Sequence, residues 1–375
     1  MQRMIVLLAV VACLAGCKAE GQGPARQSDG GRVLHGQSFE LEPVATNLTV
    51  PWAMASLPSG PMLLTERSGR LSLLDKGKLQ PIAQIPGVDH AQEHGLMGVA
   101  VSPAFHRDGL IFLSYTGRNE RGQLRNFIVR YRLKDGRLSG RRVVVDDLPA
   151  ADYHDGLPLR FGPEGKLYAS TGDATDPDLA QDRESLAGKF LRMNLDGSVP
   201  ADNPFGGSLV WSMGHRNCQG FDFHPQTGQL YAVEHGPTGG DELNLIEKGR
   251  NYGWPRHHHD DTAPPFVGPL RQWTPAIAPG GACFYDGDKV PAWRGRFFFA
   301  GLRGEGLYCV TLSKDDPRKV EAMSLVLHNE LGRVRLVAQG SDGYLYIGTS
   351  NREGRAEPDA TDDRLLRLVP AKESR

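Results

Sequence analysis

The chain has 375 residues, of which 43 are lysine or arginine and 44 are aspartate or glutamate. A charge balance this close to neutral argues against nucleic acid and against an anionic membrane surface as electrostatic partners. Glycine (46 residues) and proline (26 residues) are abundant while sustained helical periodicity is scarce, which indicates a β-rich protein with many tight turns.

The first residues have the form of an export signal. Arg3 precedes an apolar run over 4–14, which is too short to cross a bilayer because a spanning helix needs about 20 apolar residues. Leu14-Ala15-Gly16-Cys17 then resembles a bacterial lipobox, in which the cysteine is acylated and becomes the first mature residue. An ordinary cleaved signal with a chance cysteine is the alternative. We therefore expect a lipoprotein signal peptide over 1–16 and a protein that is anchored by lipid on Cys17 in the bacterial envelope, facing the periplasm.

The rest of the chain divides into a short tether and one large domain. Residues 17–38 contain glycine, glutamine and serine and almost no apolar side chains, which is typical of a flexible tether. From Phe39 onward no linker or shift in composition interrupts the sequence. We therefore expect a single β domain over 39–371.

Three cysteines fall within this domain, at Cys218, Cys283 and Cys309. An oxidising compartment permits one disulfide among them and leaves one thiol free, but their spacing does not identify the pair. The spacing also does not match that of a structural zinc site.

One signature, a turn glycine followed by a short β-rich run, recurs six times at separations of 40 to 67 residues. Four strands with their turns fill roughly 40 to 50 residues, so six copies predict an all-β, six-bladed β-propeller with long loops between some strands. A pair of β-sandwiches is the alternative, which the absence of a linker disfavours. The segment 179–194 has few apolar markers and is expected to be a loop. The copies begin at Gly69, Gly109, Gly165, Gly228, Gly295 and Gly343.

Three loops beside these signatures are dense in polar side chains. They read YHDG at 153–156, GHRNCQG at 214–220 and EHGPTGGDE at 234–242. A propeller brings such loops to one mouth of its central channel, so residues that are far apart in the sequence converge there. Any one of these histidines alone would be interpreted as an ordinary loop residue, and the interpretation as a site depends on the whole set.

The set resembles the soluble sugar dehydrogenases that use pyrroloquinoline quinone (PQQ), the glucose/sorbosone dehydrogenase family. The resemblance extends from Pro51-Trp52-Ala53 to Asp342-Gly343-Tyr344-Leu345-Tyr346, and its most specific blocks are GHRNCQG and EHGPTGGDELNLIEKGRNYGWP at 234–255. It implies a six-bladed propeller that oxidises an aldose at its anomeric carbon to a lactone, with hydride transfer to the quinone. The reduced cofactor would pass its electrons to a soluble or membrane carrier.

The resemblance assigns the catalytic chemistry to three residues. His154 matches the family's general base, and Asp173 matches the aspartate that orients it. When hydride leaves an alcohol carbon the hydroxyl proton must leave as well, so a base with a pKa near neutrality is required, and a carboxylate partner sets the tautomer of a histidine. Arg216, together with calcium, would stabilise the oxyanion that develops on the cofactor.

PQQ carries three carboxylates, so its pocket requires guanidinium groups and a metal. Arg303 stands where the family usually has a lysine, and Glu93 stands where it more often has a glutamine. A carboxylate facing a polyanionic cofactor is repelled unless it is protonated or paired with an arginine, and Gln92 or His94 are the alternative contacts. The cofactor-binding residues that the resemblance implies are Glu93, Arg216, Asn217, Arg303, Arg333 and Arg335.

Calcium in this family bridges the cofactor to backbone carbonyls of a Gly-Pro turn, which match Gly236 and Pro237. Backbone oxygens suit this hard cation. A second calcium, described for bacterial members, would use a carboxylate and a carbonyl that fit Glu242 and Tyr252. The run HHHDD at 257–261 is expected to be solvated, because adjacent residues of a loop point in divergent directions.

Two other functions remain open. A calcium-dependent lactonase or related hydrolase would need side-chain carboxylates around a metal in the channel, and a non-catalytic binding propeller would not need the base or the arginines. In addition, Gly156-Leu157-Pro158 replaces the Gly-Gly-Arg that usually follows the base, which changes either the substrate entrance or a structural ion pair. The residues identify neither the sugar or alcohol that is oxidised nor the electron acceptor.

Overall fold

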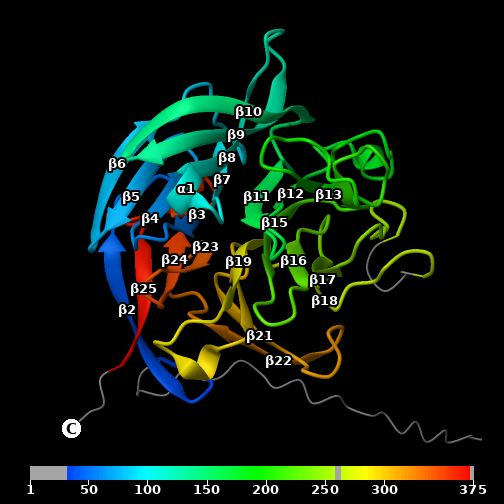
Figure 1. The fold of residues 1–375 in the computed structure, drawn as a ribbon. Helices are drawn as coiled ribbons and strands as arrows, with labels where there is room; N and C mark the ends of the chain where they lie inside the picture. Colours follow the sequence, from blue (N-terminus) through cyan, green and yellow to red (C-terminus); the bar gives the residue numbers. More distant parts are fainter. Residues whose placement is uncertain (1–31, 258–262, 372–375) are drawn as a thin grey trace, which may run out of the picture.

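The structure is a computed structural model that describes residues 32–257 and 263–371. Six antiparallel sheets are arranged around a central channel, so the protein is a six-bladed β-propeller, as the repeated signature predicts (Figure 1). In five of the six blades the strands follow one another in sequence from the channel outward, and the sixth blade combines strands from both ends of the described chain. In those five blades this order lets four short strands with tight turns form a sheet without any crossover connection.

Five blades have four strands each. The first consists of β3 (Pro51–Ser56), β4 (Met62–Glu66), β5 (Arg70–Asp75) and β6 (Lys78–Gln84). The second consists of β7 (Leu96–Val101), β8 (Leu110–Arg118), β9 (Leu124–Lys134) and β10 (Arg137–Pro149). The third consists of β11 (Gly156–Phe161), β12 (Leu167–Thr171), β13 (Lys189–Met193) and β14 (Val210–Met213).

The fourth blade consists of β15 (Cys218–Phe223), β16 (Leu230–Glu234), β17 (Asp241–Ile246) and β18 (Arg271–Trp273). The fifth consists of β19 (Pro279–Tyr285), β20 (Arg296–Gly301), β21 (Gly306–Leu312) and β22 (Val320–Val326). The sixth is built from β23 (Val334–Gln339), β24 (Leu345–Thr349) and β25 (Leu365–Pro370), together with two strands from the N-terminal side. The short helical turns are α1 (Phe105–Asp108), η1 (Pro177–Ala180), η3 (Pro291–Trp293) and η4 (Asn351–Glu353).

The two ends of the described chain close the ring. β2 (Gln37–Ala45) pairs antiparallel with β25, so that Phe39 lies opposite Pro370, and Figure 1 shows the blue β2 beside the red β25. β1 (Arg32–Leu34) adds a fifth strand outside β2. The strands that the structure describes therefore include Arg32–Leu34 and begin before the domain boundary expected at Phe39. Pairing the first and last strands hides the sheet edges that an open ring would expose.

The six turn glycines fall one in each blade. Five of them precede the second strand of their blade, but Gly69 precedes the third strand, β5. In that blade the turn before the second strand contains Gly60-Pro61 instead. The repeat therefore counts the blades correctly although one copy marks a different turn.

Two sequence expectations are corrected. The segment 179–194, expected to be a loop, contains strand β13, whose five residues are all buried between β12 and β14. Burial on both faces removes the alternation that usually reveals a strand. In the described part of the chain no disulfide joins the three domain cysteines, and Cys218, Cys283 and Cys309 are all buried free thiols.

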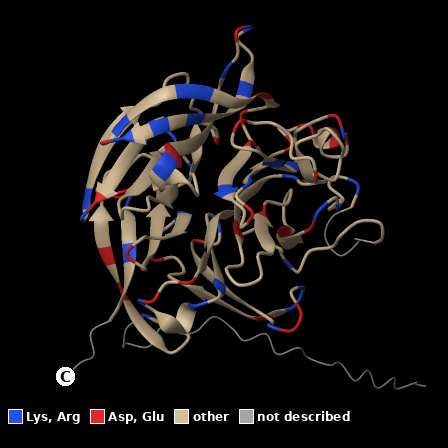
Figure 2. Ribbon diagram, viewed as in Figure 1, with Lys and Arg blue, Asp and Glu red and all other residues tan. Residues whose placement is uncertain are grey.

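Apolar side chains fill the space between neighbouring blades. Trp293, for example, is fully buried and packs edge-on against Phe39 and Tyr285, and its indole N–H donates to the carbonyl of Leu34 at 3.2 Å. Basic and acidic positions are interspersed along the ribbon, in keeping with the neutral composition (Figure 2). None of the helices in 32–257 and 263–371 has the length and apolar character that a membrane span requires.

The inner strands β3, β7, β11, β15, β19 and β23 pack against one another in a closed ring. Because every blade repeats the same antiparallel order, these strands all begin at one face of the ring, and the loops between second and third strands return to that face. We call this face the mouth. The polar loops that precede β7, β11, β15 and β23 therefore converge there.

Candidate functional site at the mouth of the channel

The proposed base and its aspartate meet at the mouth. His154 lies just before β11 and Asp173 just after β12, and Nδ1 of the imidazole is 2.7 Å from Oδ1 of the carboxylate. The carboxylate is fully buried and also accepts hydrogen bonds from the indole N–H of Trp254 (2.9 Å) and the backbone N–H of Thr175 (3.0 Å). Because a carboxylate only accepts, Nδ1 carries the proton and Nε2 is left with a lone pair. The imidazole is 21 % exposed, so a substrate can reach it.

The loop that carries His154 is held in an unusual backbone conformation. His154 has a φ of 64°, in the left-handed region that few non-glycine residues adopt. The neighbouring loop approaches closely, because a Cβ at Gly172 would lie 1.7 Å from the carbonyl oxygen of His154. Glycine is therefore required at 172 for the loops that carry His154 and Asp173 to meet.

A buried polar network also fixes the loop that carries His154. Oδ1 of Asp155 accepts hydrogen bonds from the backbone N–H of Ala151 (3.1 Å) and from the side-chain amide of Asn126 on β9 (2.9 Å). Oδ1 of Asn126 in turn accepts from the hydroxyl of Thr116 (2.6 Å). Burial raises the pKa of Asp155 to about 7. The network ties the loop of the third blade to the second blade, and no motif in the sequence indicates it.

Arg216 and Asn217 directly precede β15 beside this pair. The carbonyl of Arg216 accepts a hydrogen bond from the backbone N–H of Asp173 (2.8 Å), and its guanidinium lies 5.4 Å from the ring centre of Trp254. Among the described residues, Nε of Arg216 and both polar atoms of the Asn217 side chain are buried without a hydrogen-bond partner. Burial also lowers the pKa of Arg216. Orphaned buried polar atoms are rare in native proteins, and a polar ligand at the site would satisfy them.

Arg333 and Arg335 come together at the start of β23, where both are buried. They share the carboxylate of Glu353, which contacts Arg333 through Oε1 and Nη2 of Arg335 through Oε2 at 2.6 Å. Burial opposes ionisation of Glu353, but the two guanidinium groups outweigh it and lower its pKa to about 2. The two arginines are therefore buried cations with a built-in counter-ion, which the sequence analysis missed.

Glu93 has the arginine partner that its position requires. Its Oε1 lies 2.9 Å from Nη2 of Arg355, and the charges of His235, Arg355 and Arg335 overcome the effect of burial and lower its pKa. The carboxylate is therefore ionised and paired.

Gln92 and His94, the alternative contacts, have partners of their own. The side chain of Gln92 accepts a hydrogen bond from the hydroxyl of Tyr153 (3.0 Å), and His94 is buried with Nε2 3.5 Å from Asp89. Arg303 is exposed in the loop between β20 and β21. Its guanidinium is therefore less constrained than those of Arg333 and Arg335.

All four metal candidates line one cavity. The lining residues include Arg216 and Trp254 from the site above, and also His257, which was expected to be solvated. The hydroxyl of Tyr252 donates to the carbonyl of Leu245 and accepts from the backbone N–H of Glu247, so its backbone carbonyl is the group left for a cation. The candidate metal residues in this cavity are Gly236, Pro237, Glu242 and Tyr252.

The Gly-Pro turn is built around a buried aspartate. Oδ1 of Asp241 accepts from the backbone N–H of Gly236 (2.8 Å), and Oδ2 accepts from those of Ile277 and Ala278 (both 2.6 Å). This carboxylate is therefore committed to shaping the turn. In the described residues no cluster of three or more His, Cys, Asp or Glu side chains is arranged to hold a metal, and positions 258–261 of the HHHDD run lie outside the described residues.

Three mouth residues escaped the sequence analysis. Trp254 lies within the block at 234–255. Its indole N–H donates to Asp173, but nothing in the sequence around Trp254 indicates this partner. Glu353 and Arg355 lie in the loop between β24 and β25, which has no polar motif of the kind that marked the other loops. Only the fold brings this loop beside Glu93 and the two arginines.

Comparisons with known proteins agree with this geometry. Residues 48–366 match the family model described as glucose/sorbosone dehydrogenase. Aldose sugar dehydrogenase YliI of Escherichia coli K12 is 32 % identical over 84 % of this chain and 91 % of its own length. A structure described as a putative oxidoreductase (glucose dehydrogenase) of Thermus thermophilus is 40 % identical with a TM-score of 0.82, covering 88 % of this chain and 100 % of that one.

A PQQ-bound aldose sugar dehydrogenase of Streptomyces coelicolor is similar as well. It is 35 % identical with a TM-score of 0.80, and the match covers 89 % of this chain and 98 % of that one. The family model covers most of the propeller, and these relatives match along nearly their whole length. The chain therefore belongs to the glucose/sorbosone dehydrogenase family.

Proposed function

We propose that the protein is a PQQ- and calcium-dependent dehydrogenase that oxidises an aldose at its anomeric carbon to a lactone. The observation that carries this proposal is the His154–Asp173 pair, joined at 2.7 Å, beside the orphaned polar atoms of Arg216 and Asn217. The names of the relatives support the same activity, since one is an aldose sugar dehydrogenase and another was solved with PQQ bound.

The donor set at the mouth fits a polycarboxylate. Arg216 and Asn217 have buried polar side-chain atoms without a hydrogen-bond partner among the described residues. The trio of Arg333, Arg335 and Glu353 combines two positive charges with one negative charge. One net positive charge in a buried site favours binding of a carboxylate. Carbonyl oxygens of the Gly236-Pro237 turn suit calcium, which would join the cofactor to the fourth blade. When bound, PQQ accepts the hydride that the substrate loses.

Residues of this chain accept the proton that leaves the hydroxyl on the anomeric carbon. Nε2 of His154 takes the proton from the hydroxyl on the anomeric carbon, and loss of this proton together with the hydride converts the hemiacetal into a lactone. Asp173 keeps the other proton on Nδ1 and stabilises the imidazolium that forms. Trp254 and Thr175 hold the carboxylate in the orientation that this requires. Arg216 would stabilise negative charge that develops on the cofactor.

The two alternative functions receive less support. A metal-dependent hydrolase needs side-chain carboxylates on its metal, and at the Gly-Pro turn the carboxylate of Asp241 is already taken by three backbone N–H groups. A non-catalytic binding propeller has no use for a histidine that is held in a left-handed conformation and oriented by a buried aspartate. Strain of this kind is usually retained at functional sites.

The N-terminal sequence supports a location in the bacterial envelope. Export and attachment to a membrane by lipid on Cys17 are supported by the lipobox-like sequence at 14–17, which lies outside the described residues. Such an anchor would keep the enzyme in the envelope, where a soluble or membrane-bound carrier can accept the electrons.

The deciding experiment is reconstitution of purified apoprotein with PQQ and calcium, followed by a screen of aldoses with an artificial dye acceptor. We expect dye reduction that requires the sugar, the quinone and calcium together, with the lactone as the product. Dye reduction by no aldose or simple alcohol, at saturating quinone and calcium, would overturn the proposal and favour the binding propeller.

A further inference from the structure

Gln219 and Arg335 meet across the channel, just inside the mouth. Gln219 lies in β15 of the fourth blade and Arg335 in β23 of the sixth blade, and Nη1 of Arg335 donates to Oε1 of Gln219 at 3.0 Å. Both side chains are buried. Because a guanidinium group only donates hydrogen bonds, the amide oxygen of Gln219 is the atom that faces it. The contact therefore links two blades that are not neighbours in the ring.

Each of the two residues is the extra residue of a β-bulge. The ladder of β15 with β16 shifts register around Gln219, and the ladder of β23 with β24 shifts register around Arg335. The extra residue of a bulge has no partner in the ladder, and the bulge changes the direction of its side chain. The two bulges therefore explain how both side chains come to meet in the channel.

The strand between them, β19, approaches both neighbours closely. A Cβ at Gly280 of β19 would lie 2.5 Å from the carbonyl oxygen of Arg335, and a Cβ at Gly220 of β15 would lie 2.2 Å from the carbonyl oxygen of Gly280. Glycine within a strand is typical of such close approach of another backbone. The missing side chains at these two positions allow the three inner strands to lie close enough for Arg335 to reach Gln219.

The guanidinium of Arg335 is held from two sides. Its Nε donates to the hydroxyl of Ser350 at 3.1 Å, and its Nη2 donates to Oε2 of Glu353 at 2.6 Å. Both of these partners belong to the sixth blade, so Gln219 is the partner that holds the group from the far side of the channel. A guanidinium has further N–H groups beyond these three contacts, and they remain for a bound carboxylate.

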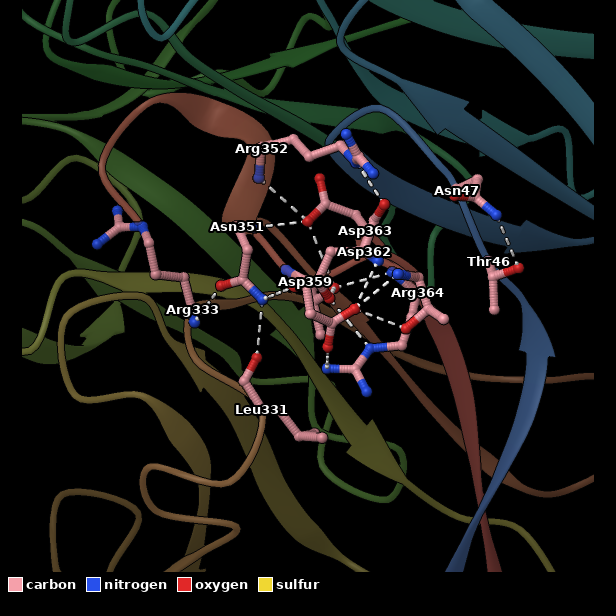
Figure 3. Close-up of polar contacts among 12 residues, drawn as sticks. Thr46, Asn47, Leu331, Arg333, Asn351, Arg352, Asp359, Asp362, Asp363 and Arg364 are labelled. Atoms are coloured by element: carbon pink, nitrogen blue, oxygen red, sulfur yellow. Dashed lines mark hydrogen bonds and ion pairs between the residues drawn. The ribbon is translucent and has the colours of Figure 1, made fainter. Parts of the chain in front are cut away.

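The loop between β24 and β25 is itself held by a buried polar cluster (Figure 3). Oδ1 of Asp363 accepts from the backbone N–H of Asn351 at 2.5 Å. The side-chain amide of Asn351 donates to Oδ2 of Asp362 (2.8 Å) and to the carbonyl of Leu331 (3.0 Å), and its Oδ1 accepts from the backbone N–H of Arg333 (2.9 Å). Because Asn351, Asp362 and Asp363 are buried, this side of the site has little freedom to move.

Positive charge exceeds negative charge around Arg335. The charged groups that act on it include Arg67, Arg333, Glu93 and Glu353. With Arg335 itself, three guanidinium groups of this set face two carboxylates. Gln219 supplies an acceptor that carries no charge, so its contact fixes the guanidinium without reducing the positive excess.

We propose that Gln219 is a positioning residue for the cofactor site, which fixes the guanidinium of Arg335 across the channel and leaves its positive charge available to a carboxylate of the quinone. This inference rests on the proposed dehydrogenase function, because it concerns the same site. A carboxylate at position 219 would hold Arg335 as well but would neutralise it. A neutral amide provides the hydrogen bond and preserves the charge.

The test compares two substitutions whose effects on stability differ. In Gln219→Leu the buried Arg335 loses a partner, so we expect Tm to fall and the affinity for PQQ, titrated by fluorescence in calcium, to fall ~10-fold. In Gln219→Glu the introduced carboxylate pairs with Arg335, so Tm should equal or exceed that of the wild type. Its affinity for PQQ should nevertheless fall ~100-fold or more, because the positive charge is neutralised. A purely structural role would reduce binding only where it reduces stability.

Gln226→Glu is the matched control. It introduces the same charge into the same blade, at an exposed position of the turn between β15 and β16 on the opposite face of the ring. We expect its affinity for PQQ to be that of the wild type. A second comparison uses Arg335→Met as the background, where Gln219→Leu should weaken PQQ binding no further, because Gln219 acts through Arg335.

These titrations need no turnover, so they decide about Gln219 even in a protein that binds the quinone and oxidises no sugar. Wild-type affinity for PQQ in Gln219→Glu, or a loss of affinity that follows a loss of Tm in that variant, would overturn the role of Gln219 and leave the dehydrogenase function standing. So would equal losses on Gln219→Leu with and without Arg335. A wild-type protein that binds no PQQ in calcium would overturn both.

Discussion

The imidazole of His154 and the carboxylate of Asp173 lie 2.7 Å apart at Nδ1 and Oδ1, although one residue precedes the first strand of its blade and the other follows the second strand. The antiparallel pairing of β11 with β12 brings the two positions to the same end of the blade, where Gly156 lies opposite Thr171. A hairpin within one sheet therefore supplies both members of this pair. This arrangement makes the chemistry of the site testable by single substitutions.

Replacing the proposed base should slow the chemistry strongly and leave cofactor binding intact. In His154→Ala we expect quinone and calcium binding close to wild type, because the arginines and the Gly236-Pro237 turn supply that affinity. Turnover should fall by ~10²–10⁴, the usual contribution of a positioned general base. Asp173→Asn should lose less, because an amide leaves the imidazole in place but no longer sets its tautomer. Steady-state kinetics with a dye acceptor and fluorescence titration of the quinone measure the two effects separately, and wild-type turnover by His154→Ala would rule out this base.

Asp155 should make the stability of the protein depend on pH. Its folded pKa of about 7 lies above that of an unfolded aspartate, so the folded state keeps a proton that the unfolded state has lost. Stability contributed by this group is therefore greatest at low pH and declines by up to ~4 kcal/mol as the pH rises from about 4 to about 7.

Asp155→Asn should remove that decline. The amide oxygen can still accept from Ala151 and Asn126, and the side chain no longer ionises. We expect the variant to gain stability relative to wild type between about pH 5 and pH 8, as measured by urea unfolding at each pH. A constant difference between the two proteins over that range would show that Asp155 does not titrate there.

Glu353 should be essential for the stability of the mouth. In Glu353→Gln the buried guanidinium groups of Arg333 and Arg335 lose their counter-ion, and breaking a buried ion pair costs ~3–5 kcal/mol. In the wild-type protein this contribution is present above the pKa of an unfolded glutamate and is lost as the pH falls toward about 2. Glu357→Gln, at an exposed position of the same loop, is the control. Denaturant unfolding near neutral pH with equal stability for both variants would contradict this role.

Calcium should control cofactor binding. The cofactor carboxylates need a cation that the carbonyls of Gly236 and Pro237 can share, so we expect the apoprotein to bind PQQ only when calcium is present. Chelation should release the cofactor, and calcium should restore its binding. The test is a fluorescence titration with PQQ in calcium and in chelator, and equal affinity in both would exclude a bridging calcium.

The lipid anchor should be separable from catalysis. Cys17→Ala should move the protein from the membrane fraction to the soluble fraction, because the acylated residue is lost. Activity should be unchanged, since the tether carries none of the site residues. Fractionation followed by activity assays of both fractions tests this, and an inactive soluble variant would show that anchoring and catalysis are coupled.

The sequence by itself determined the class of the fold. Turn glycines and short apolar runs are local features that depend on backbone conformation, so counting them predicted six blades even though Gly69 marks a different turn from the rest. Strand β13 was missed because it is buried on both faces and therefore shows no alternation. The polar loops that carry His154 and Arg216 stood out as compact motifs, and the resemblance to the family assigned roles to these two residues and to Asp173.

Only the tertiary structure decided which charges meet. Glu93 and Arg355 are separated by most of the chain, and no local pattern indicates that the loop between β24 and β25 closes over the second blade. The same loop supplies Glu353 to Arg333 and Arg335. The physical reason is the closed ring, which brings the last blade next to the first. Charged side chains pair across the mouth because they are close in space, and their separation along the chain gives no indication of this.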